Sequence, residues 1–345
     1  MRISVIIPTY NRDHLLGLLL PDIVKQSVKP MQVIVVDGNP DSRKVIDRVR
    51  SLSTELTFPI TYIPSTHANA PFQRYLGSMC LGDSDLCLFV DDDIRINHAN
   101  TIEYLSNPFQ WQHEIVAGIS PVINFPNRAV QNSKHNLLQN FFVSKGKEPG
   151  ELTPVGNRIL PEDSNEEFVE VKWLRGGVML YDIEFLKKVI YQEDVFAMAE
   201  KGYGLGVDDT YLSRCIGMYG KLLLANNVTV DHPDNDASKV YSANSQKKAY
   251  AVAYSRRFQN DHYRVTRPPT VGDRLYLLKS YLGNNLLNVI HLIRKPNQQQ
   301  FAHFLGYLQG SLRGIFQKPT AKNLTPDIDW QADADEALQK AIVIQ

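Results

Sequence analysis

The sequence of 345 residues has few cysteines and no excess of charge of either sign. Its three cysteines, Cys80, Cys87 and Cys215, have neither the number nor the spacing of a disulfide framework or a zinc site. We expect reduced, buried thiols. Lys plus Arg number 37, as do Asp plus Glu, so the formal net charge is zero. Nucleic-acid-binding proteins normally carry a basic excess, and we therefore expect no nucleic-acid partner.

Long apolar runs are also missing. The sequence contains no stretch of about 18 uninterrupted apolar residues, which predicts that it has no transmembrane helix. No apolar segment of signal-peptide type precedes the first predicted strand, Ile3–Ile7. Together these absences predict a cytoplasmic protein. Internal repeats and low-complexity segments are absent as well.

Strand and helix patterns alternate through the N-terminal part of the chain. Four short apolar runs predict buried strands: Ile3–Ile7, Val33–Val36, Ile60–Ile63 and Leu86–Val90. Helical patterns lie between them, beginning near Asp13, near Asp41 or Ser42, and at Asn69. Continuously apolar strands that alternate with helices indicate a mainly parallel sheet covered on both faces. Ligands in such sheets bind beyond the carboxyl ends of the strands.

The rest of the chain has several different patterns. Residues 124–170 are polar and rich in Asn, Pro and Gly, which predicts an excursion over the mouth of an active site. Four further elements are predicted: a strand Trp173–Tyr181 interrupted by two glycines, a helix Val207–Tyr219, a strand Leu222–Val230 and a helix Ser245–Asn260. From about Pro268, apolar residues recur at spacings of three and four in two segments separated by Pro296, which predicts a hairpin of amphipathic helices.

Three consecutive aspartates, Asp91, Asp92 and Asp93, follow the predicted strand Leu86–Val90. Because side chains alternate along a strand, Asp91 and Asp93 are expected to share one face. Two carboxylates on one edge repel each other unless a positive group lies between them, and a hard divalent cation can fill that role. A solvated acidic turn or a helix N-cap is the alternative.

Another aspartate, Asp37, ends the second predicted strand. An acid in this position can accept hydrogen bonds from a ribose or a base edge. The alternative is a turn formed by Asp37 and Gly38. No G-x-G-x-x-G pattern follows the first strand, which counts against a nicotinamide or flavin enzyme.

Two acids, Asp208 and Asp209, lie at the start of the helix predicted from Val207. Carboxylates suit a helix N-terminus, so a catalytic role and helix capping are both open. His232 follows the predicted strand Leu222–Val230 and is either a metal ligand or a structural histidine. The basic residues Arg256, Arg257, Arg264 and Arg267 either bind a pyrophosphate or form a solvated helix face.

In combination, these motifs resemble those of family 2 glycosyltransferases of the GT-A fold. The resemblance covers residues 1 to about 235 and rests on Val5–Arg12, Val35–Gly38, Leu88–Asp93, Trp173–Gly177 and Gly206–Leu212. It implies an inverting enzyme that moves a sugar from a UDP- or dTDP-sugar to an acceptor hydroxyl, with Mn²⁺ or Mg²⁺ as cofactor. The implied acceptor is a glycan or lipid-linked glycan in cell-surface polysaccharide synthesis. The Gln-x-x-Arg-Trp motif of processive synthases is absent, which favours addition of one sugar per visit.

The resemblance also implies a role for individual residues. The implied contacts to the nucleotide sugar are Pro8, Thr9, Tyr10, Arg12, Asp37, Arg74, Asp91 and Asp92. The implied metal site is Asp93, Asp91 and His232, the aspartates forming a DXD motif. The implied acceptor side is Trp173, Arg175, Gly176 and Gly177. Asp209 would be the catalytic base, beside Asp208 where glutamate is commoner, and Arg74 matches the family's Ala-Arg-Asn segment only in part because Tyr75 replaces the Asn.

The predicted fold is a GT-A-like, Rossmann-type α/β domain whose mainly parallel sheet is flanked by helices, with a C-terminal helical extension. Residues 1–268 are assigned to the catalytic domain, with 1–120 as the nucleotide-sugar-binding half and 121–268 as the acceptor-binding half. Residues 269–317 are assigned to the hairpin, and 318–345 to a loosely structured tail.

Basic residues lie near the apolar stripes of the hairpin, and Asp273 is the only acid between residues 273 and 322. This charge pattern predicts that residues 273–316 attach the protein to the inner face of a membrane. Packing on the catalytic domain and pairing with another copy are the alternatives, so a homo-oligomer is left open. Gly306, Gly310 and Gly314 recur every four residues, which predicts that their face turns toward protein.

Two other functions remain open. One is a catalytically silent relative that serves as a binding or scaffold subunit, although such a protein would be expected to lose Asp93 or Asp209, and both are present. The other is a nucleotidyltransferase, which would want a glycine-rich loop with Arg or Lys after the first strand, where this sequence has Pro8–Arg12.

Overall fold

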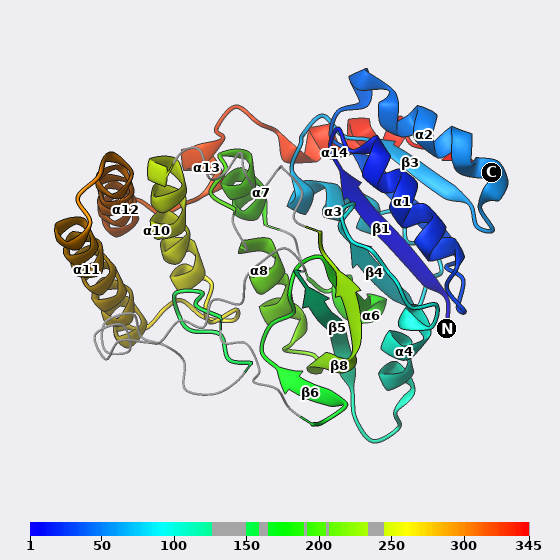
Figure 1. Cartoon of the computed structure of the whole chain (residues 1–345), viewed down its shortest axis with the longest axis horizontal. Helices are drawn as coiled ribbons and strands as arrows, with labels where there is room; N and C mark the ends of the chain where they lie inside the picture. Colours follow the sequence, from blue (N-terminus) through cyan, green and yellow to red (C-terminus); the bar gives the residue numbers. More distant parts are fainter. Residues whose placement is uncertain (126–149, 159–164, 190–191, 205–206, 234–244, 345) are drawn as a thin grey trace.

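The computed structural model describes residues 1–125, 150–158, 165–189, 192–204, 207–233 and 245–344. Its centre is a nine-stranded sheet with the strand order β6-β8-β5-β7-β4-β1-β2-β3-β9. Helices cover both faces of this sheet, and a group of three long helices stands at one side of it (Figure 1). The described part of the chain contains no helix that is long and apolar enough to span a membrane.

The N-terminal half forms the parallel part of the sheet, as predicted. Its strands are β1 (Ile3–Thr9), β2 (Gln32–Asp37), β3 (Ile60–Pro64) and β4 (Leu86–Val90), and each neighbouring pair is parallel. The helices are α1 (Asp13–Val24), α2 (Lys44–Leu52), α3 (Ala70–Ser78) and α4 (Thr101–Ser106). Short 3-10 turns occur at Pro40–Ser42, Ser53–Glu55 and Asn107–Gln110.

Alternation along β1 explains why this half needs helices on both faces. Val5 and Ile7 pack in the core that contains α1 and α2, whereas Ile6 packs in the core that contains α3. All three side chains are fully buried. A strand with no polar face is stable only between two layers, so the sheet becomes the middle layer of the domain.

The C-terminal half of the sheet is mixed. Its strands are β5 (Val116–Asn124), β6 (Phe168–Val171), β7 (Val178–Asp182) and β8 (Lys221–Asp231). β5 and β8 are parallel, while β7 is antiparallel to both β4 and β5. The helices here are α6 (Ile183–Leu186), α7 (Glu193–Glu200), α8 (Val207–Ile216) and α10 (Ser245–Asp261).

Of two sequence-based expectations for this half, one differs from the structure and the other falls mostly outside the described residues. The predicted strand Trp173–Tyr181 is wrong in its first part: only the residues from Val178 onward are strand, because Gly177 takes a φ of +113° that breaks an extended backbone. The predicted excursion over the active site, residues 124–170, falls mostly on 126–149 and 159–164, which lie outside the described residues.

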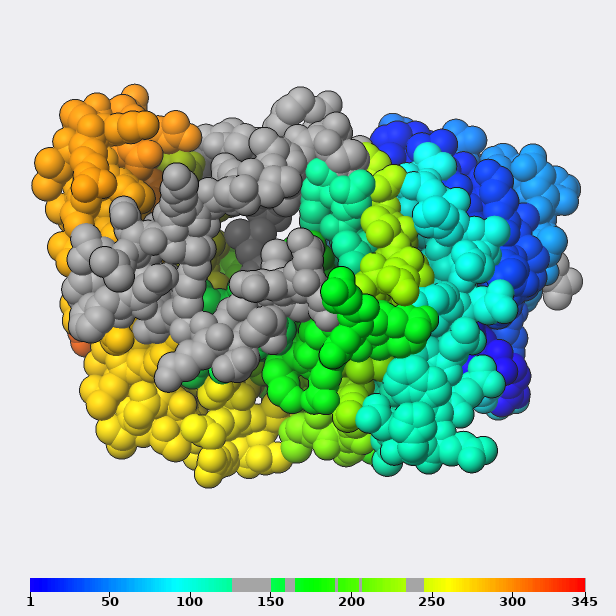
Figure 2. All heavy atoms as spheres, turned by 60° about the horizontal axis from the view of Figure 1, so that its bottom comes forward, coloured from blue at the N-terminus to red at the C-terminus, as the bar shows by residue number. Residues whose placement is uncertain are grey.

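The predicted hairpin of amphipathic helices is confirmed. It consists of α11 (Val271–Arg294) and α12 (Gln298–Phe316). Thr270 and Asp273 form a capping box at the start of α11. The hairpin lies at the opposite end of the molecule from the N-terminal half (Figure 2).

The glycine face of α12 turns toward protein, as predicted. A Cβ atom added to Gly306 would overlap the backbone of Gln246, and one added to Gly310 would overlap the carbonyl oxygen of Tyr250. Gly314 sits in the same way against the Tyr281 hydroxyl. The absence of side chains therefore lets α12 lie directly on the backbone of α10.

This close packing predicts the effect of a single methyl group. Gly310→Ala is expected to lower the free energy of unfolding by about 1–3 kcal/mol, the usual cost of overpacking a well-packed contact. Gly272→Ala is the matched control, because a Cβ at Gly272 meets nothing closer than 3.7 Å, and it should leave stability unchanged or slightly raised. Urea denaturation of both variants measures the difference, and equal stability would contradict the close contact.

The prediction of a loosely structured tail is wrong. After α12 the chain forms α13 (Ala321–Leu324), α14 (Trp330–Gln339) and β9 (Ile342–Ile344), and β9 pairs with β3 at the edge of the sheet. This segment crosses the molecule from the hairpin back to the N-terminal half (Figure 1). The sequence signal was weak because the buried face of α14 consists of Trp330 and two alanines, Ala334 and Ala337.

Trp330 anchors α14 in an aromatic cluster. Its ring lies 4.7 Å from that of His67, 5.2 Å from Phe72 and 5.4 Å from Phe196, measured between centroids. The side chain of Trp330 is 2% exposed. These contacts come from the β3–α3 loop, α3 and α7, so tertiary packing rather than local propensity orders the end of the chain.

Candidate active site

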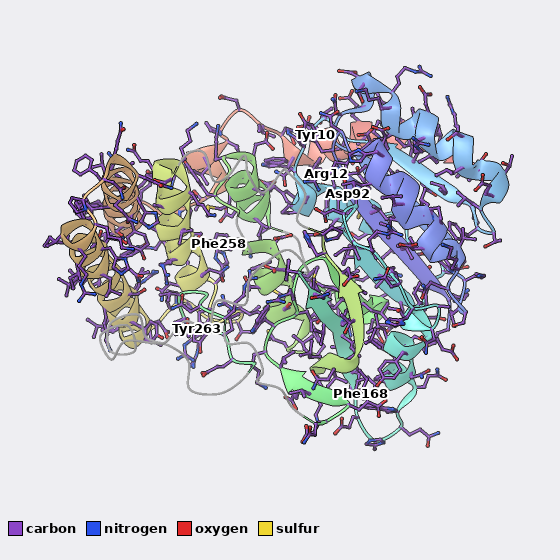
Figure 3. The ribbon with its side chains drawn as sticks, viewed as in Figure 1. Tyr10, Arg12, Asp92, Phe168, Phe258 and Tyr263 are labelled. Carbon is purple, nitrogen blue, oxygen red and sulfur yellow. The ribbon has the colours of Figure 1, made fainter. Side chains whose placement is uncertain are left out.

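The predicted site residues of the N-terminal half gather where β1, β2 and β4 end. Tyr10 and Arg12 follow β1, and Asp92 follows β4; these three residues lie close together beyond the sheet (Figure 3). Thr9, the last residue of β1, is 3% exposed, whereas the Tyr10 side chain is 49% exposed. Parallel strands bring these loops to one edge because their carboxyl ends point the same way.

Asp92 is buried at the base of this edge. Its carboxylate accepts hydrogen bonds from the Thr9 hydroxyl at 2.7 Å and from the Arg12 guanidinium at 2.8 Å. Burial raises the pKa of Asp92 to about 6, although Arg12 and Thr9 oppose the shift. Asp92 therefore ties the loop after β1 to the loop after β4.

Asp93 lies beside one guanidinium group and one imidazole ring. Its carboxylate is 3.1 Å from the Arg12 guanidinium and 3.5 Å from Nε2 of His232. Burial raises the pKa of Asp93, and the negative charge of Asp91 raises it further. The mutual repulsion of Asp91 and Asp93 agrees with the expectation that they lie near each other.

Arg74 connects this cluster to the acidic pair of α8. One nitrogen of its guanidinium lies 2.5 Å from Asp91, and another donates to Asp208. The Arg74 side chain is only 7% exposed. Burial raises the pKa of Asp208, while the charge of Arg74 opposes the shift. A buried guanidinium between two carboxylates holds their loops together through charge-assisted hydrogen bonds.

The glycine loop before β7 joins the same two groups through its backbone. Gly177 accepts a hydrogen bond from the Asp91 amide at 2.8 Å, and Gly176 donates one to the Asp209 carboxylate at 3.2 Å. A Cβ on Gly176 would stand 3.2 Å from that same carboxylate oxygen. A glycine at this position lets the backbone approach the acid closely.

Asp209 is held from a second side by Arg158. The Arg158 guanidinium donates to the Asp209 carboxylate at 2.9 Å, and it lies over the ring of Trp173 at 5.1 Å. Asp209 also accepts from its own helix at the Thr210 amide, at 2.8 Å. Sequence reasoning missed Arg158, because it lies in a polar stretch with no local motif.

Trp173 and Arg175, the other residues predicted for the acceptor side, lie in the loop between β6 and β7. Trp173 is 5% exposed, so the pairing with Arg158 takes place at the edge of the core. Arg175 donates to the carbonyl oxygen of Ile123 at 3.4 Å and lies over the ring of Phe125 at 5.3 Å. The ring of His232 is 5.1 Å from the same Phe125 ring, which brings the loop after β8 to this side of the site.

Asp37 lies at the end of β2 but points into the protein. Its side chain is 0% exposed, and its two oxygens accept from the Tyr62 hydroxyl and the Asn39 amide, each at 2.9 Å. Burial raises the pKa of Asp37. In this structure the carboxylate is enclosed by these two partners, and a contact between Asp37 and the nucleotide sugar stays a prediction.

The basic residues of α10 and the following loop do not form one site. Arg256 donates to Asn157, Arg257 pairs with Asp261, and Arg264 pairs with Asp273, each at 2.9 Å. These partners lie in three different parts of the helical region. Arg256, Arg257 and Arg264 therefore stabilise the packing around α10 and α11, whereas Arg267 is exposed and lines a pocket together with Arg264.

The charge of the assembled site favours a cation or a cationic ligand. Five carboxylates are offset only in part by three guanidinium groups. The acids are Asp91, Asp92, Asp93, Asp208 and Asp209, and the guanidinium groups are those of Arg12, Arg74 and Arg158. Among the described residues, no three His, Cys, Asp or Glu side chains form a complete cluster for a metal ion. Mg²⁺ and Mn²⁺ commonly use one or two carboxylates and take their remaining ligands from phosphates and water. Asp91 and Asp93 fit a site of this kind, in which the protein supplies only two carboxylates.

Comparison with known proteins gives matches of three kinds. Residues 4–159 match the model of glycosyl transferase family 2. A stretch of 92 residues is 33% identical to an uncharacterized glycosyltransferase of Haemophilus influenzae, and it spans 26% of this chain and 29% of that relative. The chain thus aligns with less than a third of the length of this curated relative.

Solved structures share the fold over almost the whole chain. The crystal structure of S. aureus TarS 1–349 superimposes with a TM-score of 0.52 at 14% identity, over 98% of this chain and 88% of that chain. TarS 1–349 in complex with UDP-GlcNAc superimposes with a TM-score of 0.53 at 15% identity, over 98% and 89%. At this identity the likeness concerns the fold, which is of the GT-A type. Residues 4–159 are thus similar to glycosyl transferase family 2, and the chain as a whole shares the GT-A type of fold.

Proposed function

We propose that the protein is an inverting glycosyltransferase that moves one sugar from a nucleoside diphosphate sugar to an acceptor hydroxyl. The observation that carries this proposal is the junction at Arg74 and Gly176–Gly177. It places the aspartates that follow β4 next to the acidic pair that begins α8. A donor site and a proton acceptor are then neighbours, as a single displacement requires.

The donor is proposed to bind at the carboxyl ends of β1 and β4. Pro8, Thr9, Tyr10 and Arg12 would border the nucleotide, with Asp91 toward the ribose. The complex of TarS with UDP-GlcNAc supports a nucleotide sugar as the class of donor, because the two folds superimpose over 98% of this chain. A UDP- or dTDP-sugar remains our proposal for this chain.

Asp93, Asp91 and His232 are proposed to hold Mn²⁺ or Mg²⁺. The electrostatics of these residues fit a cation: burial and the neighbouring Asp91 raise the pKa of Asp93, as expected for a carboxylate that a cation would stabilise in its charged form. His232 reaches Asp93 with Nε2 at 3.5 Å. When bound, the cation would neutralise charge on the diphosphate leaving group.

Asp209 is proposed to be the general base. It would accept the proton of the acceptor hydroxyl while that oxygen forms a bond to the anomeric carbon and the bond from this carbon to the diphosphate breaks. The attack comes from the face opposite the leaving group, so one displacement inverts the centre. Arg158 and the Gly176 amide would hold the carboxylate in place, and Asp208 would orient Arg74.

A simple experiment separates this proposal from the two alternatives. Purified protein with Mn²⁺ is incubated with a panel of nucleoside diphosphate sugars, and hydrolysis or transfer is followed together with the anomeric configuration of the product. Slow release of the nucleoside diphosphate with inversion supports the proposal. A scaffold subunit would release nothing, and a nucleotidyltransferase, supplied with a nucleoside triphosphate and a sugar phosphate, would transfer the nucleotidyl group to the sugar phosphate and release pyrophosphate.

We further propose that the acceptor is a glycan or lipid-linked glycan and that the hairpin 273–316 rests on the inner face of a membrane. Residues 1–120 would then serve the donor and 121–268 the acceptor. The outer face of α11 supports this placement, because it exposes an apolar stripe at helical spacing: Val271, Leu275, Leu278, Leu282, Leu286 and Ile293. Leu277, Ser280 and Tyr281 are buried on the opposite face.

The basic residues beside this stripe support an anionic lipid surface as its partner. Lys279, Arg294 and Lys295 are exposed on α11 and just after it, and the one acid of the hairpin, Asp273, is buried and paired with Arg264. Each basic group near an anionic surface contributes on the order of 1 kcal/mol. α12 adds exposed apolar side chains at Phe301, Leu312 and Phe316.

The expected result is tested by sedimentation with vesicles. Leu275 and Leu282 are 60% and 72% exposed, so Leu275→Glu/Leu282→Glu should fold normally and partition into anionic vesicles at least about tenfold more weakly. Leu18→Glu is the matched control, since Leu18 is 45% exposed on α1, in the other half of the molecule. Equal pelleting of the three proteins would rule out the stripe as the membrane anchor, and loss of a dimer in light scattering would assign it to a second copy.

A further inference from the structure

We propose that the C-terminal segment 330–344 completes the donor site by forming one wall of a pocket for the nucleobase, with Lys340 donating a hydrogen bond to a carbonyl group of the base. The inference rests on the proposed function, because it needs a nucleotide-sugar donor. It concerns residues far beyond the matched segment 4–159, and it assigns a role to a part of the chain whose sequence predicted only a loose tail.

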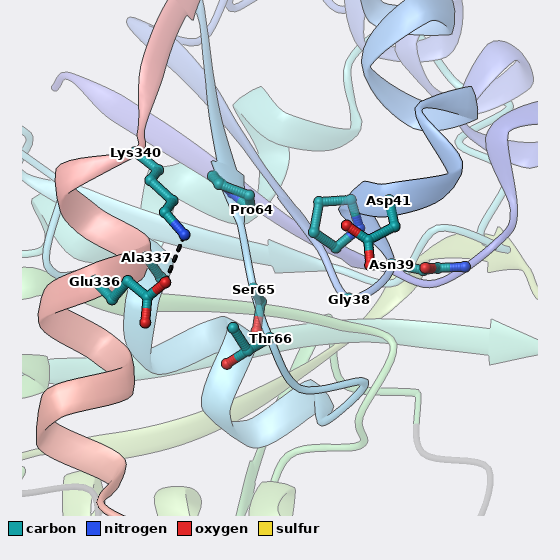
Figure 4. A pocket seen from close by; sticks show the side chains of 10 residues that line it. Gly38, Asn39, Asp41, Pro64, Ser65, Thr66, Glu336, Ala337 and Lys340 are labelled. Atoms are coloured by element: carbon teal, nitrogen blue, oxygen red, sulfur yellow. Dashed lines mark hydrogen bonds and ion pairs between the residues drawn. The ribbon is translucent and has the colours of Figure 1, made fainter.

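The pocket has a volume of about 400 Å³, within the range of small-molecule sites. One side is formed by the loop after β2, and the floor by the end of β3 and the residues after it. The other side is the last turn of α14 (Figure 4). Its lining residues are Gly38, Asn39, Pro40, Asp41, Pro64, Ser65, Thr66, Glu336, Ala337 and Lys340.

The position of this pocket fits the base end of a donor. It lies beyond the carboxyl ends of β2 and β3, where ligands bind in open α/β sheets. Asn39 donates to Asn11 at 2.7 Å, and the Gly38 amide donates to Thr9 at 2.9 Å. The pocket therefore adjoins the loop after β1 that is proposed to border the nucleotide.

The pocket offers recognition groups in addition to Asp37, which is not among its lining residues. The carboxylate of Asp37 is 0% exposed and accepts from Tyr62 and Asn39. The ionisable side chains that line the pocket are Asp41, Glu336 and Lys340, and all three are exposed. Glu336 lies on α14, and Lys340 is the residue that directly follows this helix.

The wall formed by α14 is firmly placed. β9 pairs with β3 through Ile60–Ile344, Thr61–Val343 and Tyr62–Ile342. His67, which comes just after the floor of the pocket, lies 2.8 Å from the Asp333 carboxylate, and its ring contacts that of Trp330 at a tilt of 45°. A group carried by this helix is therefore held in position before a ligand arrives, which lowers the entropic cost of binding.

The chemistry of the lining indicates which bases suit it. The Lys340 ammonium can only donate hydrogen bonds, and in this structure it pairs with Glu336 at 2.5 Å on the rim of the pocket. Uracil and thymine present carbonyl oxygens on their edge, whereas adenine has none. A lysine on this wall therefore favours a uridine or thymidine diphosphate over adenosine diphosphate.

Calorimetry on the full chain with Mg²⁺ tests the inference. Lys340→Ala is expected to weaken UDP binding about 10- to 100-fold, the usual effect of losing a hydrogen bond to a charged group, and to leave the affinity for inorganic pyrophosphate unchanged. Thr66→Trp, which narrows the pocket from its floor, should weaken UDP in the same selective way. Lys322→Ala is the matched control, because Lys322 is an exposed lysine on α13, outside the pocket lining.

Two outcomes would overturn the inference, and they are distinguishable. If Lys340→Ala and Thr66→Trp both bind UDP as tightly as the wild type, the base does not lie in this pocket, although the proposed function stands. If the wild-type protein binds no nucleoside diphosphate at all, the proposed function and the inference fail together.

Discussion

Asp209→Asn is expected to reduce the rate of sugar transfer by about 100- to 10,000-fold, the usual effect of removing a general base. The amide keeps the shape of the side chain but cannot take the proton of the acceptor hydroxyl. Its one oxygen can still accept from Arg158 and Thr210, which both donate to Oδ1 of the wild-type carboxylate, and only the longer bond from the Gly176 amide to Oδ2 is lost. The substitution therefore tests proton transfer with little change of structure.

Donor affinity separates this effect from a general loss of the site. Asp209 contacts the loop Gly176–Gly177 and α8, so the binding of the nucleoside diphosphate in calorimetry should be close to that of the wild type. Asp208→Asn is the companion variant, because Asp208 pairs with Arg74 and through it reaches Asp91. We expect that variant to weaken donor binding as well. A wild-type transfer rate in Asp209→Asn would contradict the assignment and make Asp208 the candidate base.

Removal of the cation or of Asp93 is expected to weaken nucleoside diphosphate binding by at least about 100-fold. Loss of a group that merely supports a metal ligand typically costs 10- to 100-fold, and Asp93 is proposed to be a ligand itself. The physical reason is charge: the site already holds five carboxylates against three guanidinium groups, and a diphosphate adds further negative charge. Without a cation, Asp91 and Asp93 would repel the ligand.

Calorimetry with and without a chelator measures this effect, with Asp93→Ala as the variant. Asp47→Ala is the matched control: Asp47 is an exposed aspartate on α2, and its side chain is 61% exposed. The control should behave as the wild type at every metal concentration. Equal affinity for the nucleoside diphosphate with and without metal would contradict the proposed cation site.

The sequence predicted the N-terminal half of the sheet well because its signals are local. The strands at Ile3, Gln32, Ile60 and Leu86 are buried apolar runs, and Asn69 caps α3 as expected. It predicted the second half less well. β5, β6 and α7 have no strong periodicity, and their positions depend on neighbours that are distant in the chain.

The candidate site shows the same difference. The acids Asp91, Asp93, Asp208 and Asp209 could be proposed from their motifs, but their common location depends on Arg74 and the loop Gly176–Gly177. Arg158 escaped notice because an ion pair with Asp209, 51 residues away, leaves no pattern in the chain. The orientation of Asp37 toward Tyr62 is likewise decided by the packing of β2 against β3.

By itself, the sequence determined the parallel half of the sheet, the amphipathic hairpin with its inward glycine face, and the set of acids of the candidate site, because each depends on spacing within one segment. Only the tertiary structure decided that the last residues form α14 and β9 and turn back to β3 in the N-terminal half. A ten-residue helix with two buried alanines and a three-residue strand are too weak to form alone. They are ordered by Trp330 in its aromatic cluster and by the free edge of β3, contacts that exist only once the rest of the chain has folded.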